Sequence, residues 1–141
     1  MAVRILIVDD HEVVRQGVRS ILQSRPNWEI CGEASDGHEA VYLAKELQPD
    51  IILLDVTMPV MGGLAAASYI LQSNRDAKIL IFTMHESATL AKLAQKTGAR
   101  GLVVKSQAGP NLIQALEKVL AGNTYFSTGD EFHHQESGKV T

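Results

Sequence analysis

Short apolar runs alternate with longer segments in which apolar residues recur every three or four positions, and this alternation constrains the fold more than any other feature. Such runs are typical of buried strands, and the longer segments are typical of helices with one apolar face. Repeated strand–helix units predict an α/β domain with a parallel sheet and helices on both faces. The predicted strands span residues 3–8, 28–34, 51–54, 78–82 and 101–104, and the predicted helices span about 13–22, 38–47, 64–72, 87–97 and 110–122.

Right-handed crossovers between these strands favour a doubly wound, five-stranded parallel sheet in the order 2-1-3-4-5, the flavodoxin-like arrangement. The strand at 28–34 is the least apolar and is therefore expected at an edge of the sheet. In the first helix, Val13 and Gly17 are both expected on the buried stripe, where the glycine would allow close packing. Ligands of such sheets bind beyond the carboxyl ends of the strands, at the point where the strand order reverses.

Polar residues stand at the ends of four predicted strands. Asp9 and Asp10 follow the first strand, Asp55 the third, Thr83 the fourth and Lys105 the fifth. Carboxylates brought within about 5 Å of one another would repel by roughly 3 kcal/mol per pair at an effective dielectric constant of about 20. A hard divalent cation removes that penalty, and carboxylate ligands favour Mg²⁺ over zinc. Helix capping would explain one aspartate of the first pair but not the whole set.

Composition limits the remaining possibilities. The 141 residues are 45% apolar, which is sufficient for a single core, and the net charge of −3 argues against a nucleic-acid-binding surface on this chain. Cys31 is the single cysteine, so no internal disulfide is expected. The sequence has no predicted signal peptide or membrane span, so we expect a cytoplasmic protein that does not contact membranes. The predicted domain covers residues 1–122, and residues 123–141 are expected to be a polar linker or tail.

The segments that carry these polar residues resemble the receiver domain of two-component response regulators over residues 2–122. They are the acidic pair in ILIVDDH, the acceptor segment LLDVTMPVMGG, the threonine in ILIFTMH and the lysine in GARGLVVKS. All four stand in the order and at the spacings of a receiver. The pieces TMHE, GARG and AGNTYFS are similar to the NarL/LuxR-type branch, whose members usually continue into a helix-turn-helix domain.

The resemblance implies a role for each acidic residue. Asp55 would be the phosphoacceptor that attacks the phosphohistidine of a histidine kinase. Asp10 and Asp55 would bind Mg²⁺ with the main-chain carbonyl of Thr57, and Asp9 would reach the metal through water. These roles agree with phosphoryl transfer, in which catalysis depends on in-line positioning and on cations that stabilise developing charge.

The resemblance also implies that Lys105 is a second cation at the site and that Thr83 binds a phosphoryl oxygen and draws its loop inward. His85 is expected near the mouth of the site, where with Thr57 it would tune the access of water; a solvated loop histidine is the alternative. The family usually has an aromatic switch residue three positions before the lysine, and this chain has Leu102 there.

Two further departures from the family concern the loops that follow the fourth and fifth strands. Met84 stands where many receivers have a small residue, so it is expected to hinder small phosphodonors and water. Ser106 replaces a proline that often follows the lysine.

The implied function is a phosphoacceptor rather than an enzyme, with autocatalysed phosphoryl transfer and dephosphorylation. The implied partners are a sensor histidine kinase, a second copy in a homodimer, and DNA through a C-terminal helix-turn-helix domain that this chain lacks. A stand-alone receiver that acts by protein contact or in a phosphorelay is the alternative. A Mg²⁺-dependent phosphatase of similar fold is disfavoured, because such enzymes need an aspartate as general acid where this chain has Thr57.

Overall fold

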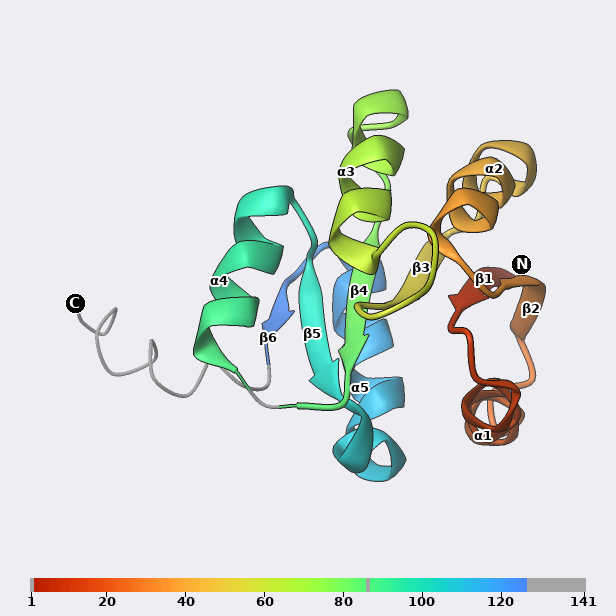
Figure 1. Cartoon of the computed structure of the whole chain (residues 1–141). Helices are drawn as coiled ribbons and strands as arrows, with labels where there is room; N and C mark the ends of the chain where they lie inside the picture. Colours follow the sequence, from red (N-terminus) through yellow and green to blue (C-terminus); the bar gives the residue numbers. More distant parts are fainter. Residues whose placement is uncertain (1, 86, 127–141) are drawn as a thin grey trace.

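The computed structural model describes residues 2–85 and 87–126, which form one parallel sheet with helices on both faces (Figure 1). Within these residues the six strands are β1 (Val3–Val8), β2 (Trp28–Ala34), β3 (Ile51–Asp55), β4 (Ile79–Thr83), β5 (Gly101–Val104) and β6 (Tyr125–Phe126). The five α-helices there are α1 (Glu12–Leu22), α2 (Gly37–Leu47), α3 (Gly63–Ser73), α4 (Ala88–Thr97) and α5 (Ala108–Leu120), and the 3₁₀ turn η1 (Lys105–Gln107) precedes α5.

The strand order is β2-β1-β3-β4-β5-β6, and every neighbouring pair is parallel. The predicted α/β class and the predicted order of the first five strands are therefore confirmed, with β2 at an edge. The sheet differs from the prediction by its sixth strand. Because the order reverses between β1 and β3, the carboxyl ends of these two strands form the expected ligand-binding edge.

Alternate residues of the buried strands pack into two separate cores, one on each face of the sheet. Leu6, Leu54 and Ile81 face α2, α3 and α4, whereas Ile7 and Leu53 face α1 and α5. Figure 1 shows the same division of the helices between the two faces. The central strands are apolar on both faces for this reason, as parallel strands covered by helices must be.

The short strand β6 extends the sheet beyond β5. Gly101 pairs with Tyr125, and Leu102 pairs with Phe126, which is buried among the residues that face α4. A Cβ atom at Gly101 would lie 2.6 Å from the main-chain oxygen of Tyr125, so the glycine allows this close approach. The linker or tail predicted for residues 123–141 thus contributes two residues to the sheet, and residues 127–141 lie outside the described part of the chain.

Three details of the helices differ from the sequence-based expectation. Helix α5 begins at Ala108 rather than Pro110, because the turn η1 leads directly into it. Val13 is 77% exposed, and nothing lies within 4 Å of a Cβ atom placed at Gly17, so neither residue packs against the sheet. The buried face of α1 is instead formed by Val18 and Leu22.

The ends of α4 agree with the prediction. The Ser87 side chain accepts a hydrogen bond from the Leu90 main chain at 3.0 Å, and Gly98 ends the helix in the left-handed conformation. Among the described residues, no helix is long and apolar enough to cross a membrane.

Candidate functional site

The carboxyl ends of the four central strands bring the predicted polar residues to one edge of the sheet. Val8 pairs with Leu54, so Asp9, which follows Val8, lies beside Asp55 at the end of β3. Thr83 ends β4, and Lys105 follows the last residue of β5. A pocket at this edge is lined by Asp10, His11, Asp55, Thr57, Met58, Pro59, Thr83, Met84, His85 and Lys105.

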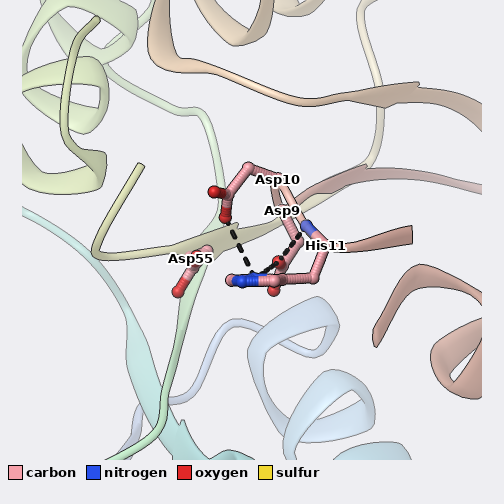
Figure 2. Close-up of side chains that lie close together, drawn as sticks. All are labelled: Asp9, Asp10, His11 and Asp55. Atoms are coloured by element: carbon pink, nitrogen blue, oxygen red, sulfur yellow. Dashed lines mark hydrogen bonds and ion pairs between the residues drawn. The ribbon is translucent and has the colours of Figure 1, made fainter. Parts of the chain in front are cut away.

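Three of the carboxylates converge with one histidine (Figure 2). Asp9, Asp10, His11 and Asp55 each offer a ligand atom, and these atoms all lie within 4.8 Å of one another. Asp9 and Asp55 are buried, whereas Asp10 lies at the exposed side of the cluster. Carboxylate oxygens at this spacing suit a hard divalent cation such as Mg²⁺, so the residues present fit the predicted metal.

Lys105 provides the positive charge within this cluster. Its Nζ atom lies 2.6 Å from Asp9 Oδ2 and 3.2 Å from Asp55 Oδ1, and its side chain is only 13% exposed. The lysine reaches the cluster from the end of β5, two strands away from β3. A single ammonium group therefore links the two buried carboxylates.

Burial raises the pKa of Asp55 above its usual range, and the neighbouring Asp9 carboxylate raises it further. The ammonium group of Lys105 acts in the opposite direction and lowers the pKa of Asp55, but it does not cancel the effect of burial. The Asp55 carboxylate is thus held in an environment that penalises its negative charge. Any change that removes this charge or adds a cation relieves the penalty.

The loop between β3 and α3 is fixed close to Asp55. The Gly63 main-chain N–H donates to the Val56 carbonyl at 2.8 Å, which closes the loop. A Cβ atom at Gly63 would lie 1.9 Å from the Asp55 main-chain oxygen, so no other residue fits there without movement of the backbone. Thr57 is exposed within the loop and lines the pocket.

The loop after β4 contains the predicted switch threonine. Thr83 is buried, and its hydroxyl accepts a hydrogen bond from the His85 main-chain N–H at 3.4 Å. Met84 is 63% exposed and lines the pocket together with His85, so both lie at the mouth as the sequence indicated. Leu102 is fully buried in β5 beside Phe126.

Two residues at this edge were missed by sequence reasoning. His11 is the N-cap of α1, and its Nδ1 atom lies 3.1 Å from Asp10 Oδ1 and 3.3 Å from Asp9 Oδ1. Arg15 donates from its guanidinium group to the main-chain oxygen of Asp9. A signal existed for His11, because it follows the acidic pair directly in the sequence. The contact of Arg15 with a main-chain oxygen depends on where α1 begins and carries no such signal. His11, and not Asp9 or Asp10, is the N-cap residue of α1, and its side chain makes no capping hydrogen bond, so N-capping does not explain the two aspartates.

The doubly wound sheet, the buried carboxylates at its switch point and the lysine and threonine beside them define a class of α/β domain with an acidic site at the carboxyl edge of a parallel sheet. Comparison with known proteins identifies the family: residues 5–117 match the model of the response regulator receiver domain. The chain belongs to this family, which confirms the resemblance found in the sequence.

Relatives of known name support the same assignment. The chain is 35% identical to the transcriptional regulatory protein DegU of Brevibacillus brevis over 87% of its length and 52% of DegU. It is 36% identical to the response regulator UvrY of Escherichia coli K12, over 89% of its length and 58% of UvrY. The chain therefore spans about half the length of the curated relatives that it matches.

Solved structures resemble the chain over nearly all of its length. A two-component response regulator of the LuxR family from Aurantimonas sp. SI85-9A1 superposes with a TM-score of 0.89 at 39% identity, covering 96% of this chain and all of the other. The receiver domain of the NarL response regulator from Mycobacterium tuberculosis gives a TM-score of 0.80 at 30% identity, covering 86% of this chain and 98% of the other. Both likenesses agree with the predicted NarL/LuxR-type branch.

Proposed function

We propose that Asp55 is the phosphoacceptor of this receiver domain and that the donor is the phosphohistidine of a sensor histidine kinase. One observation carries the proposal: Asp55 is a buried carboxylate at the switch point of the sheet that opens into a pocket and contacts the Lys105 ammonium group at 3.2 Å. A carboxylate oxygen would attack the phosphorus atom. The nitrogen–phosphorus bond of the donor would break, the imidazole would leave with a proton from solvent, and Asp55 would become an acyl phosphate.

The metal ligands in this proposal are the carboxylates of Asp10 and Asp55 and the main-chain carbonyl of Thr57, with Asp9 acting through water. Bound Mg²⁺ would supply positive charge to the phosphoryl oxygens during transfer. Lys105 would add a second positive charge beside the same oxygens, because its ammonium group already contacts Asp9 and Asp55. The same groups would serve both the transfer and the later hydrolysis, so the domain is an acceptor with autocatalysed steps rather than an enzyme that acts on a separate substrate.

Thr83 is the proposed sensor of phosphorylation. Its buried hydroxyl lies at the end of β4 and lines the pocket with Asp55, so a phosphoryl group on Asp55 would offer it an oxygen to bind. This contact would draw the β4–α4 loop toward the site. Leu102 cannot signal through an aromatic ring, so we assign no switch to its side chain.

The proposed output is transcription through a C-terminal helix-turn-helix domain. The likeness to DegU, which is named a transcriptional regulatory protein and of which the chain covers about half, supports transcription as the output. The helix-turn-helix domain is the one implied by the resemblance to the NarL/LuxR-type branch. We propose that the receiver domain comprises residues 1–122 together with the strand β6, that the residues beyond Phe126 lead to that further domain, and that phosphorylation favours a homodimer. We also propose the cytoplasm as the location, because a kinase donor and a DNA-binding output would both be reached there.

The intact mass of the protein tests the acceptor. After incubation with acetyl phosphate and Mg²⁺, and separately with a phosphorylated histidine kinase, we expect one added phosphoryl group that maps to Asp55 and is absent without Mg²⁺. Asp55→Asn should abolish the adduct. Asp50→Asn is the matched control, because Asp50 stands at the opposite end of the same strand and accepts a hydrogen bond from the Arg4 main chain at 2.7 Å. A stable adduct on another residue, or none with either donor, would overturn the proposal.

A further inference from the structure

A network of ion pairs between α1 and β2 reaches the acidic cluster through one arginine. Arg15 Nε donates to Glu33 Oε1 at 2.9 Å, and its guanidinium group also pairs with Glu12. The same guanidinium donates to the main-chain oxygen of Asp9. The Arg15 side chain is only 15% exposed, so most of its surface is shielded from solvent where it makes these contacts.

Arg19 belongs to the same network but does not reach Asp9. It bonds both carboxylate oxygens of Glu33, at 2.7 and 2.6 Å, and it pairs with Glu12 at 3.2 Å. The two arginines therefore share both acidic partners. Within the described residues, they differ in the hydrogen bond from Arg15 to the Asp9 carbonyl.

This one contact lies on the peptide unit between two residues of the acidic cluster. The Asp9 main-chain N–H donates to the Ala34 carbonyl at 3.0 Å, and Asp9 Oδ1 accepts from the His11 main-chain N–H at 2.9 Å. The main-chain carbonyl of Asp9 accepts from Arg15. Because the carbonyl of Asp9 and the amide of Asp10 belong to one rigid plane, fixing the oxygen fixes the direction in which Asp10 leaves the strand.

The charge of the arginine would by itself oppose a cation at the acidic cluster. Glu12 and Glu33 together offset the charges of Arg15 and Arg19, since each of these carboxylates pairs with both arginines. The network thus provides a strong hydrogen-bond donor to the Asp9 carbonyl at little electrostatic cost to the neighbouring site.

We propose that Arg15 is a positioning residue for the divalent-metal site: by holding the peptide between Asp9 and Asp10, it orients the Asp10 carboxylate toward Asp55. This inference rests on the metal site of the proposed function and adds a residue that lies outside it. Arg19 and Glu33 stabilise the same part of α1 and β2 without orienting the ligand.

The test compares Arg15→Ala with Arg19→Ala in two measurements. The dissociation constant for Mg²⁺, from a titration followed by NMR chemical shifts, should rise about tenfold or more in Arg15→Ala and change less than about twofold in Arg19→Ala. The free energy of unfolding, from urea denaturation without metal, should fall in both variants, because both lose ion pairs with Glu12 and Glu33. Arg15→Lys keeps the positive charge and one donor nitrogen, so it should recover part of the Mg²⁺ affinity. If Arg15→Ala does not fold, Arg15→Lys takes its place in the comparison.

Equal Mg²⁺ affinity in wild type and Arg15→Ala would overturn the positioning role. An equal loss of affinity in both arginine variants would also overturn it, because it would show that the affinity follows the stability of the network. A wild-type protein that binds no Mg²⁺ would overturn the metal site itself. The last result is distinct from the first two, so failure of the inference and failure of the proposed function can be separated.

Discussion

The ammonium nitrogen of Lys105 lies 2.6 Å from Asp9 Oδ2, although the two residues are 96 positions apart in the sequence. Asp9 is almost fully buried, and the same ammonium group also contacts Asp55. The lysine thus occupies the side of the acidic cluster that faces β5. A buried carboxylate pair needs such a charge, because two like charges at short range repel strongly away from water.

Removal of Lys105 should strengthen the binding of Mg²⁺. The nearby ammonium group repels a divalent cation bound at Asp10 and Asp55. Without the ammonium group, the divalent cation is the only positive charge that neutralises these carboxylates. We expect Lys105→Ala to lower the Mg²⁺ dissociation constant about three- to tenfold, which corresponds to roughly 1 kcal/mol. Isothermal titration calorimetry measures this, with Lys96→Ala on the exposed side of α4 as the control. Weaker binding in Lys105→Ala would show that the lysine supports the metal site instead of competing with it.

The stability of Asp55→Asn should depend on pH in a direction that the structure determines. Burial and Asp9 raise the pKa of Asp55 in the folded protein. An ionised carboxylate with a raised pKa destabilises the fold above that pKa, and the cost disappears below the pKa of the unfolded chain, about 3.9 for aspartate, where both states are protonated. Without Mg²⁺, Asp55→Asn should therefore be more stable than wild type at neutral pH, and the difference should shrink as the pH falls.

Urea denaturation between about pH 4 and 7.5 measures this dependence in the presence of a chelator. Asp76→Asn, in an exposed turn after α3, should give no such trend. A variant less stable than wild type at neutral pH would mean that the bond to Lys105 outweighs the cost of burying the Asp55 charge.

The sequence predicted most of the fold because five strands carry their own signal. The strand β3, for example, is apolar from Ile51 to Leu54, and each of the five strands is followed by a segment of helical period. Strand β6 has no such signal, since Tyr125 and Phe126 are too few to show a period. Its pairing with β5 needs the room that Gly101 leaves for the backbone of Tyr125, and this close approach is seen only in the tertiary structure.

The candidate site was predicted to a similar extent and for a similar reason. Asp55, Thr83 and Lys105 could be found because parallel strands deliver their last residues to one edge. Arg15 could not, because its contact is with the main-chain oxygen of Asp9 and depends on where α1 begins. The expectation that Val13 is buried was wrong. Its spacing from the other apolar residues fits the buried face of α1, but its side chain is exposed to solvent.

Two glycine-to-alanine substitutions should have opposite effects on stability. At Gly63 the added methyl group would lie 1.9 Å from the Asp55 main-chain oxygen and 2.9 Å from Val56 Cα, so the acceptor loop must move. We expect Gly63→Ala to lower the free energy of unfolding by about 1–3 kcal/mol or more. At Gly17, on the exposed side of α1, nothing lies within 4 Å of an added Cβ atom. Gly17→Ala should raise the free energy of unfolding by about 0.5–1 kcal/mol, because alanine has the higher helix propensity.

Urea denaturation of both glycine variants measures the difference. The Gly63→Ala variant should also accept less phosphate from acetyl phosphate than Gly17→Ala, because the displaced backbone belongs to Asp55. Wild-type stability in Gly63→Ala would show that the loop relaxes without cost and would contradict the close packing of Gly63 against β3.

Strand β6 should belong to the stable unit of the domain. Phe126 is 6% exposed and packs with Leu102 in the core that faces α4, so its removal leaves apolar surface of β5 in water. Truncation after Gly122 should lower the free energy of unfolding by about 2–4 kcal/mol relative to truncation after Phe126, because burial of one phenylalanine contributes on this scale. Urea denaturation of the two truncated chains, with Phe126→Ala in the full chain as a third measurement, tests this. Equal stability of the two truncated chains would place the boundary of the folded domain at residue 122. The expected loss of stability would move that boundary to residue 126, so that β6 connects β5 to the rest of the chain.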